Sequence, residues 1–371
     1  MDKLISRTVS YDNKLHLTVN LNNPVIRYQE NPIITCHDVN KVWKDPGLQV
    51  ITVHNAGITQ MGEDTLMLFR SHLRSGISVL GLARSKNGLD NWRIDSEPFM
   101  KPATEEDWID DRLDRKTIIE SESGGVEDPR ITKIEDYYAI TYSAYHQSIK
   151  NRVRVSLAIT RDFVSVKRYG PMLDRDMRNV VIFPEKINGE YSALFRPNDV
   201  TEDDCGGVYT QIRLGYTKSL EDGNWGIQTD PVMQTGAGPS SFADKIGPGA
   251  PPVKTLKGWL NIFHGVRSTM DGNPYVIGVA LHDLSNPTKI KMSSIPIIFP
   301  SRADCLTDIS DYVHVPNVVF TCGAVHHDDG TILIYYAGND TVMNVAITHE
   351  DILIALCEHY GQDPVNGRLF Y

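Results

Sequence analysis

The stretch Leu80-Gly-Leu-Ala-Arg-Ser-Lys86 decides the fold, because the chain repeats its pattern of an apolar run, a small residue and a polar turn. The five copies are residues 80–86, 155–161, 212–218, 277–283 and 343–349. The small residues at their centres are Ala83, Ala158, Gly215, Ala280 and Ala346. Self-similarity of this kind indicates one structural unit repeated five times.

Two further patterns precede each copy in a constant order. A charged or glycine turn followed by an apolar and aromatic run occupies residues 62–70, 135–142, 188–196, 256–264 and 328–336. A third strand-like segment comes before each of these runs, at residues 54–59, 127–132, 182–187, 249–254 and 316–320. Turn residues before β-branched and aromatic runs indicate hairpins. We therefore expect an all-β, five-bladed β-propeller of four-stranded units as a single domain over residues 1–371, with a pair of β-sandwiches as the alternative.

The two ends of the chain depart from the repeat. Residues 349–360 carry Ile352, Leu353, Leu356 and Cys357 at helical spacing, which predicts a short C-terminal helix followed by a tail to residue 371. Residues 1–30 form an N-terminal extension that we expect to close the fold or to reach a neighbouring subunit.

Composition and charge exclude several classes of protein. The chain has 47 acidic and 37 basic residues and a net charge of −10, without a Lys/Arg-rich run, so we expect no nucleic-acid partner. It has no apolar run of 18 residues and no apolar segment near its first residues, which predicts no membrane span, no signal peptide and a cytoplasmic location.

Its cysteines are odd in number and scattered, as expected for reduced thiols: Cys36, Cys205, Cys305, Cys322 and Cys357. No metal site and no cofactor are predicted, because the chain lacks a nucleotide fingerprint and the His326-His-Asp-Asp329 run is expected to be solvated in a hairpin turn.

A candidate acid lies in the segment Glu127-Asp-Pro-Arg130. Pro129 favours an extended Asp128, and Arg130, two positions on, is expected on the same strand face, where it would orient the carboxylate. The alternative is an Asp–Arg bridge that orders the start of a strand. Glu127 is expected to point the other way. In a propeller, Asn55 and the pair Glu185 and Lys186 would also face the central axis, as polar residues of first strands.

A set of basic residues lies near strand ends in consecutive units: Arg178, Arg196, Lys245 and His264. Each alone is typical of a surface charge. If they converge beside Asp128, they suit an anionic substrate such as phosphate.

Several motifs together resemble glycoside hydrolase family 130, the β-mannoside phosphorylases and related β-mannosidases. They include Asn55-Ala-Gly, Glu127-Asp-Pro-Arg, Phe183-Pro-Glu-Lys, Lys245-Ile-Gly-Pro-Gly-Ala-Pro-Pro and Gly338-Asn-Asp-Thr. The resemblance implies a five-bladed propeller with Asp128 as catalytic acid. It places the mannose at Asn55, Arg70 and Asp340, with Arg130 beside them, and the phosphate at five positions: Arg178, Arg196, Lys245, His264 and Tyr275. Ala56 departs from members that carry a small hydroxyl residue there.

This resemblance implies an inverting phosphorolysis of a β-mannoside, with inorganic phosphate as co-substrate and α-mannose 1-phosphate as product. The chain's ending and the Glu127-Asp-Pro-Arg form favour β-1,2-mannobiose or β-1,2-oligomannan over β-1,4-linked mannosyl-glucose, mannosyl-N-acetylglucosamine or manno-oligosaccharides. The alternatives are a β-mannosidase that uses water, a mannosyltransferase that uses GDP-mannose, and a non-catalytic glycan-binding propeller. Relatives in the family are often oligomers, so a homo-oligomer is expected.

Overall fold

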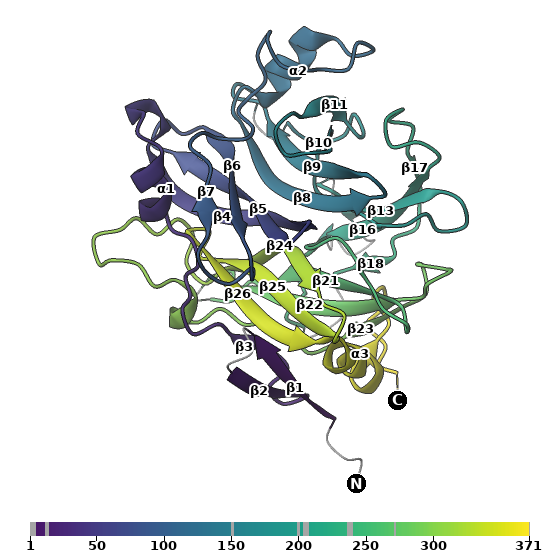
Figure 1. Cartoon of the computed structure of the whole chain (residues 1–371). Coiled ribbons are helices and arrows are strands. Elements are labelled where there is room, and N and C mark those ends of the chain that lie inside the picture. Colours follow the sequence, from purple (N-terminus) through teal and green to yellow (C-terminus); the bar gives the residue numbers. More distant parts are fainter. Residues whose placement is uncertain are drawn as a thin grey trace.

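The computed structural model describes residues 5–11, 15–149, 152–198, 201–202, 208–235, 240–270 and 272–370. These residues are mostly β-strands (Figure 1). Their three α-helices are α1 (Cys36–Val42), α2 (Arg115–Glu122) and α3 (Glu350–His359). None of these helices is long and apolar enough to span a membrane. Helix α3 confirms the predicted C-terminal helix.

Within the described residues, the long strands form five antiparallel groups that follow one another along the chain. The first group is β4 (Val50–Met61), β5 (Asp64–Leu73), β6 (Ser78–Ser85) and β7 (Arg93–Ile94). The second is β8 (Gly125–Ile134), β9 (Tyr137–Tyr145), β10 (Val153–Thr160) and β11 (Lys167–Pro171). The third is β12 (Met177–Ile182), β13 (Tyr191–Pro197), β16 (Gln211–Thr217) and β17 (Gly226–Ile227), with β18 (Met233–Gln234) also on β16. One parallel contact between Ser78 and Gly125 joins the first two groups into one sheet.

The last two groups follow the same plan. In the fourth, β19 (Lys245–Pro248) and β20 (Val253–Lys254) both pair with β21 (Trp259–Val266), and β22 (Tyr275–His282), β23 (Ile290–Ser293) and β27 (Gly361–Gln362) follow. The fifth is β24 (Val319–His326), β25 (Thr331–Gly338), β26 (Val342–His349) and β3 (Ile26–Arg27). Two small hairpins stand apart, β1 (Ser6–Tyr11) with β2 (Leu15–Asn20) and β14 (Thr201–Glu202) with β15 (Val208–Tyr209).

The N-terminal segment supplies the outer strand of the last group. Arg27 in β3 lies opposite Ala346 in β26, so the first and last parts of the chain share one sheet. The hairpin β1–β2 contributes Val9 and Val19 to the same apolar core as β4, β5 and β25. This pairing confirms that the extension belongs to the fold; whether it also reaches another subunit stays a prediction.

The predicted second and third strands of each unit are confirmed, but the first strands of the last three units are displaced. In the fourth unit only Val253–Lys254 of the predicted segment 249–254 is a strand, and in the fifth β24 begins at Val319, near the end of the predicted segment 316–320. Strand β12 ends at Ile182, where the sequence predicted this strand to begin. Glu185 and Lys186 are consequently exposed: Glu185 pairs with Lys254 on the surface, and the Lys186 ammonium lies 4.6 Å from the ring centroid of Tyr191. The prediction that these two residues face the interior is therefore wrong.

Three consecutive first strands contain the same backbone irregularity. In β4, β8 and β12, a bulge contains Asn55, Asp128 and Asn179, with φ of 49°, 49° and 58°. Asn and Asp adopt this left-handed region more readily than other residues with a β-carbon. The prediction that Pro129 makes Asp128 extended is therefore wrong. Strand β8 contacts both β4 and β12, so the three bulges lie on neighbouring strands. They position the polar side chains described next.

Candidate active site

Asp128 is the centre of a buried hydrogen-bond network. Its side chain is 7% exposed, and its Oδ1 accepts hydrogen bonds from Asn55 Nδ2 at 2.9 Å and from Arg70 Nη1 at 3.1 Å. Burial raises the pKa of Asp128, but the guanidinium groups of Arg70 and Arg130 and the Asn55 amide outweigh it and hold this pKa well below its usual range. The carboxylate is therefore ionised in the unliganded protein.

Glu127 belongs to the same network, contrary to the expectation that it points away. Its Oε1 accepts hydrogen bonds from Arg70 Nη2 at 2.8 Å and from Ser78 Oγ at 3.1 Å. Its Oε2 lies 3.9 Å from Arg178 Nη1. The bulge between Glu127 and Arg130 breaks the regular alternation of side chains, which is why neighbouring carboxylates both reach Arg70.

The same bulge changes the partner of Arg130. The alternation of strand residues predicted that Arg130 would pair with the Asp128 carboxylate. The Arg130 side chain is instead fully buried and makes other contacts. It donates to the backbone carbonyl of Asp128 at 2.7 Å, to Asn179 Oδ1 at 2.8 Å and to the carbonyl of Gly249 at 3.2 Å. Arg130 therefore links three strand groups and holds the backbone that carries Asp128.

Asp340 completes this side of the site from the turn between β25 and β26. Its φ of 49° places it in the left-handed region. Burial and the charges of Asp128 and Glu127 raise its pKa to about 7, while Arg70 opposes them. The structure thus brings together four residues that the sequence analysis assigned to the mannose and the acid: Asn55, Arg70, Asp128 and Asp340.

The predicted phosphate residues gather on the other side of β8. Arg178 and Arg196 lie opposite each other on β12 and β13. His264 on β21 lies opposite Gly247 in β19, the strand that begins with Lys245. The rings of His264 and Tyr275 are stacked with centroids 6.1 Å apart. All five predicted residues thus come from adjacent strands of the third and fourth groups.

Arg178 lies 3.9 Å from the Glu127 carboxylate, but Arg196 and His264 have no carboxylate partner among the described residues. Neither Arg196 Nε nor His264 Nδ1, both buried, has a hydrogen-bond partner among the described residues. Burial and the charges of Arg178 and Arg130 lower the pKa of Arg196 to about 10, against the effect of Tyr275. Burial, Arg196 and Arg130 hold the pKa of His264 well below its usual range. Such a group favours binding of an anion.

Sequence reasoning missed two members of the site, Asn179 and Ser78. Asn179 would have been found by aligning the repeats on their Asn or Asp residues, because Asn55, Asp128 and Asn179 occupy equivalent bulges. Ser78 carries no such signal. It reaches Glu127 because β6 contacts β8 at the point where the two sheets join.

A family profile described as β-1,4-mannooligosaccharide phosphorylase matches residues 22–359. The chain belongs to glycoside hydrolase family 130. This confirms the resemblance that the motifs carry.

Named family 130 proteins are similar along most of the chain. A 1,2-β-oligomannan phosphorylase from Thermoanaerobacter sp. (strain X514) is 34% identical over 272 residues, which cover 73% of this chain and 78% of that protein. The β-1,2-mannobiose phosphorylase of Listeria innocua is 28% identical over 366 residues, covering 86% and 94%. The solved structure of a Listeria innocua β-1,2-mannobiose phosphorylase in complex with β-1,2-mannobiose superposes with a TM-score of 0.72 at 25% identity, covering 90% of this chain and 99% of that one.

Proposed function

We propose that this family 130 protein is an inverting glycoside phosphorylase, which cleaves a β-mannoside with inorganic phosphate to give α-mannose 1-phosphate and a released sugar. The observation that carries the proposal is the position of the Asp128 carboxylate beside a basic group in which only Arg178 lies near a carboxylate, Glu127 at 3.9 Å, and in which buried nitrogens of Arg196 and His264 lack partners among the described residues. An inverting hydrolase needs a second carboxylate to activate water. Phosphate is already a nucleophile and needs cations to hold it.

The proton balance of the reaction fits an Asp128 that is ionised at rest. The phosphate oxygen forms a bond to the anomeric carbon, and the bond from that carbon to the glycosidic oxygen breaks. Hydrogen phosphate loses one proton overall, and the released sugar gains one. Asp128 therefore need only pass a proton on, and a bound phosphate adds negative charge beside it, which raises the pKa of Asp128 toward the donating range. Family resemblance suggests that the proton passes through the 3-hydroxyl of the mannose.

The remaining residues position the two substrates. Asn55, Arg70 and Asp340 surround the Asp128 carboxylate and would hold the mannose hydroxyls beside it. The five phosphate residues would place the anion next to the anomeric carbon and offset its charge: Arg178, Arg196, Lys245, His264 and Tyr275. Such positioning and charge stabilisation supply several kcal/mol of the barrier reduction in enzymes.

The favoured substrate is a β-1,2-linked mannobiose or oligomannan. The two named relatives and the solved structure described above act on, or bind, β-1,2-linked mannosides. The family profile carries a β-1,4 description, so a β-1,4-mannoside is the alternative. The test is synthesis from α-mannose 1-phosphate over mannose, glucose and N-acetylglucosamine as acceptors, with the product linkage read by NMR. A β-1,2 product on mannose supports the proposal, and a β-1,4 product on glucose or N-acetylglucosamine overturns this choice.

We further infer that the five strand groups are blades of a five-bladed propeller formed by residues 1–371. The first strands contact one another in order, β4 with β8, β8 with β12 and β12 with β19, and β24 contacts both β4 and β21. The pairing of β3 with β26 ties the two ends of the chain into one blade. Action in the cytoplasm, as a homo-oligomer, without a cofactor or metal, is proposed on the sequence analysis alone.

A further inference from the structure

A group of three polar rings lies near Arg70. We call it the imidazole rim: His72, Tyr312 and His314. His72 follows Arg70 by two positions in β5 and therefore projects from the same face of the strand. Its Nδ1 lies 3.3 Å from Ser78 Oγ, the hydroxyl that donates to Glu127. The rim is thus in direct contact with the network that holds Asp128.

His314 reaches this position from the long connection between β23 and β24. Its ring centroid is 5.7 Å from that of His72, and its Nδ1 is 2.8 Å from the Tyr312 hydroxyl. Its backbone N–H donates to Thr341 Oγ1 at 3.0 Å, immediately after Asp340. The connection therefore places two rings beside the predicted mannose residues.

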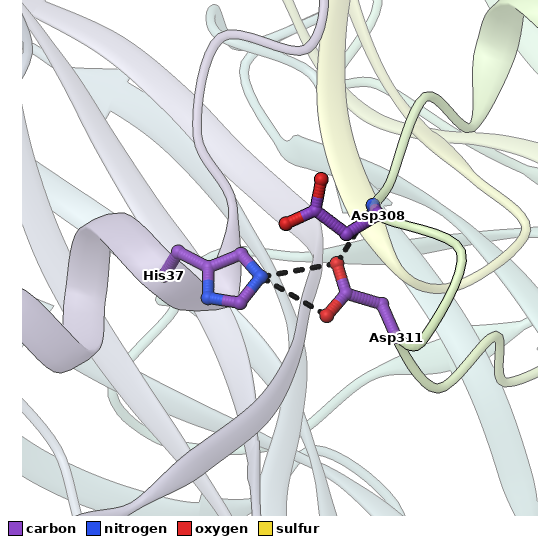
Figure 2. Close-up of side chains that lie close together, drawn as sticks. All are labelled: His37, Asp308 and Asp311. Atoms are coloured by element: carbon purple, nitrogen blue, oxygen red, sulfur yellow. Dashed lines mark hydrogen bonds and ion pairs between the residues drawn. The ribbon is translucent and has the colours of Figure 1, made fainter.

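Two sets of contacts fix this connection to the rest of the protein. One set is at Asp304, before the segment that carries the rings, and the other is at Asp311, within that segment. The buried Asp304 accepts hydrogen bonds from Arg27 at 2.6 Å and from the Tyr336 hydroxyl at 2.7 Å. Figure 2 shows His37 of α1 facing both carboxylate oxygens of Asp311, each 3.0 Å from Nε2. The segment that carries the rings is therefore held in place by the hydrogen bond between His37 and Asp311.

Figure 2 also shows Asp308; one ring nitrogen of His37 and one carboxylate oxygen each of Asp308 and Asp311 lie within 4.8 Å of one another. His37 and Asp308 are exposed, and the hydrogen bond between His37 and Asp311 accounts for the arrangement without a metal. We therefore treat these residues as an anchor of the connection.

The rim suits a neutral, hydroxyl-rich ligand. Burial and the nearby Arg70 lower the pKa of both His72 and His314, so each ring is uncharged at neutral pH and offers one donor and one acceptor. Both side chains are partly exposed, unlike Asp128 and His54 behind them. The rim therefore forms the accessible edge of this part of the site.

Hydrogen-bonding capacity remains unused directly behind the rim. His54 is completely buried, its ring centroid lies 6.1 Å from that of His314, and neither of its ring nitrogens has a partner among the described residues. The same is true of the buried hydroxyl of Thr52, on the same face of β4. Buried polar groups are normally satisfied by protein, water or ligand. Their clustering shows that buried hydrogen-bonding groups without protein partners lie next to the rim.

The stereochemistry of inversion assigns the ligand. In an inverting displacement the nucleophile and the leaving group lie on opposite faces of the sugar ring. The cations lie on β12, β13, β19 and β21, whereas His72 lies with Arg70 on β5, and strand β8 contacts both β5 and β12. We propose that the imidazole rim binds the acceptor sugar, the one released by phosphorolysis, through neutral hydrogen bonds. This inference rests on the proposed function and names the residues that would recognise the second sugar.

The test uses the full-length protein in the synthetic direction, with α-mannose 1-phosphate and mannose. The variants are His72→Ala, His314→Ala and Tyr312→Phe, and His359→Ala, at the exposed end of α3, is the matched control. Loss of one hydrogen bond to a sugar hydroxyl predicts a rise of roughly tenfold in the KM for mannose for each histidine variant. Tyr312→Phe should give a smaller rise because it only frees the His314 ring. The KM for α-mannose 1-phosphate should stay unchanged in all of them.

Two results overturn the inference while leaving the proposed function intact. One is an unchanged KM for mannose in both histidine variants that retain the wild-type melting temperature. The other is an equal rise in the KM for mannose and for α-mannose 1-phosphate, because that indicates general damage to the site. If His314→Ala does not fold, His72→Ala and Tyr312→Phe decide the matter. Failure of the wild-type protein to form any disaccharide instead contradicts the proposed function.

Discussion

The two flanks of Asp128 differ in how their charged groups are paired. On the flank of β4 and β5, Arg70 lies between Glu127 and Asp128 and donates a hydrogen bond to each carboxylate. On the flank of β12, β13 and β21, Arg178 and Arg196 face each other with His264 nearby, and buried nitrogens of Arg196 and His264 lack partners in the described part of the chain.

This difference indicates what each flank binds. A flank whose arginine is paired with carboxylates can recognise a neutral sugar with fixed dipoles. A flank with excess buried cations is costly without a ligand and gains most from an anion. The contrast between the flanks, more than any single residue, distinguishes phosphorolysis from hydrolysis.

The largest expected effect tests the residue that both flanks share. Asp128→Asn keeps the hydrogen bonds from Asn55 or Arg70 only in part and cannot pass a proton, so kcat should fall by about 10³-fold or more in both directions. Initial rates of phosphorolysis and synthesis measure this, with Asp111→Asn, an exposed carboxylate, as the control. Retention of more than a tenth of the wild-type rate would remove Asp128 from the chemistry.

Removing one arginine from each flank should affect stability differently. Arg70→Met leaves two buried carboxylates without their cation, and we expect a loss of about 3–5 kcal/mol in the free energy of unfolding. Arg196→Met removes a cation that burial disfavours, as its lowered pKa indicates, and should leave stability unchanged or raise it. Urea denaturation of both variants measures the difference. Equal losses would contradict the contrast between the flanks.

Phosphate affinity should depend on the cationic flank alone. Arg196→Met and Lys245→Ala each remove a charge-assisted hydrogen bond to the anion, so the KM for phosphate should rise by roughly 10- to 100-fold. The KM for the mannoside should change little, because these residues lie away from Asn55 and Arg70. Lys289→Ala, an exposed lysine, is the control. An unaltered phosphate KM in both variants would exclude this flank as the phosphate site.

The smallest expected effect is a change in the pKa of His264 when phosphate binds. The pKa of His264 is held well below its usual range by burial and by Arg196 and Arg130, so the folded protein keeps this ring neutral. The stability gained from this neutral ring is present above the ordinary histidine pKa of about 6.5 and is lost as the pH falls below it. A bound phosphate favours the charged ring and should raise the pKa of His264, while that of the buried His282, at about 4, should not move. NMR titration with and without phosphate compares the two, and no shift at His264 would place phosphate elsewhere.

The sequence predicted the repeat better than the local geometry. Repeated apolar runs with a small central residue were enough to find the strands β6, β10, β16, β22 and β26, because these strands are buried on both faces. The bulges were not predictable in the same way. They depend on a left-handed residue whose position is set by neighbouring strands, and they reversed the expected directions of Glu127 and Arg130.

The two flanks also differ in how well their contacts could be predicted from the sequence. The basic residues stand at strand ends, where position alone indicated that they converge. The partners of Arg70 come from β8 and β6, and those of His72 include a connection that begins after β23, so these contacts depend on packing between groups distant in sequence. Periodicity within one strand carries no information about them.

The most direct test of the central claim is cleavage of β-1,2-mannobiose by the wild-type protein with and without inorganic phosphate, followed by NMR of the anomeric protons. The account predicts α-mannose 1-phosphate and mannose in equal amounts when phosphate is present, and no turnover when it is absent. Release of free mannose alone, at the same rate without phosphate, would contradict it.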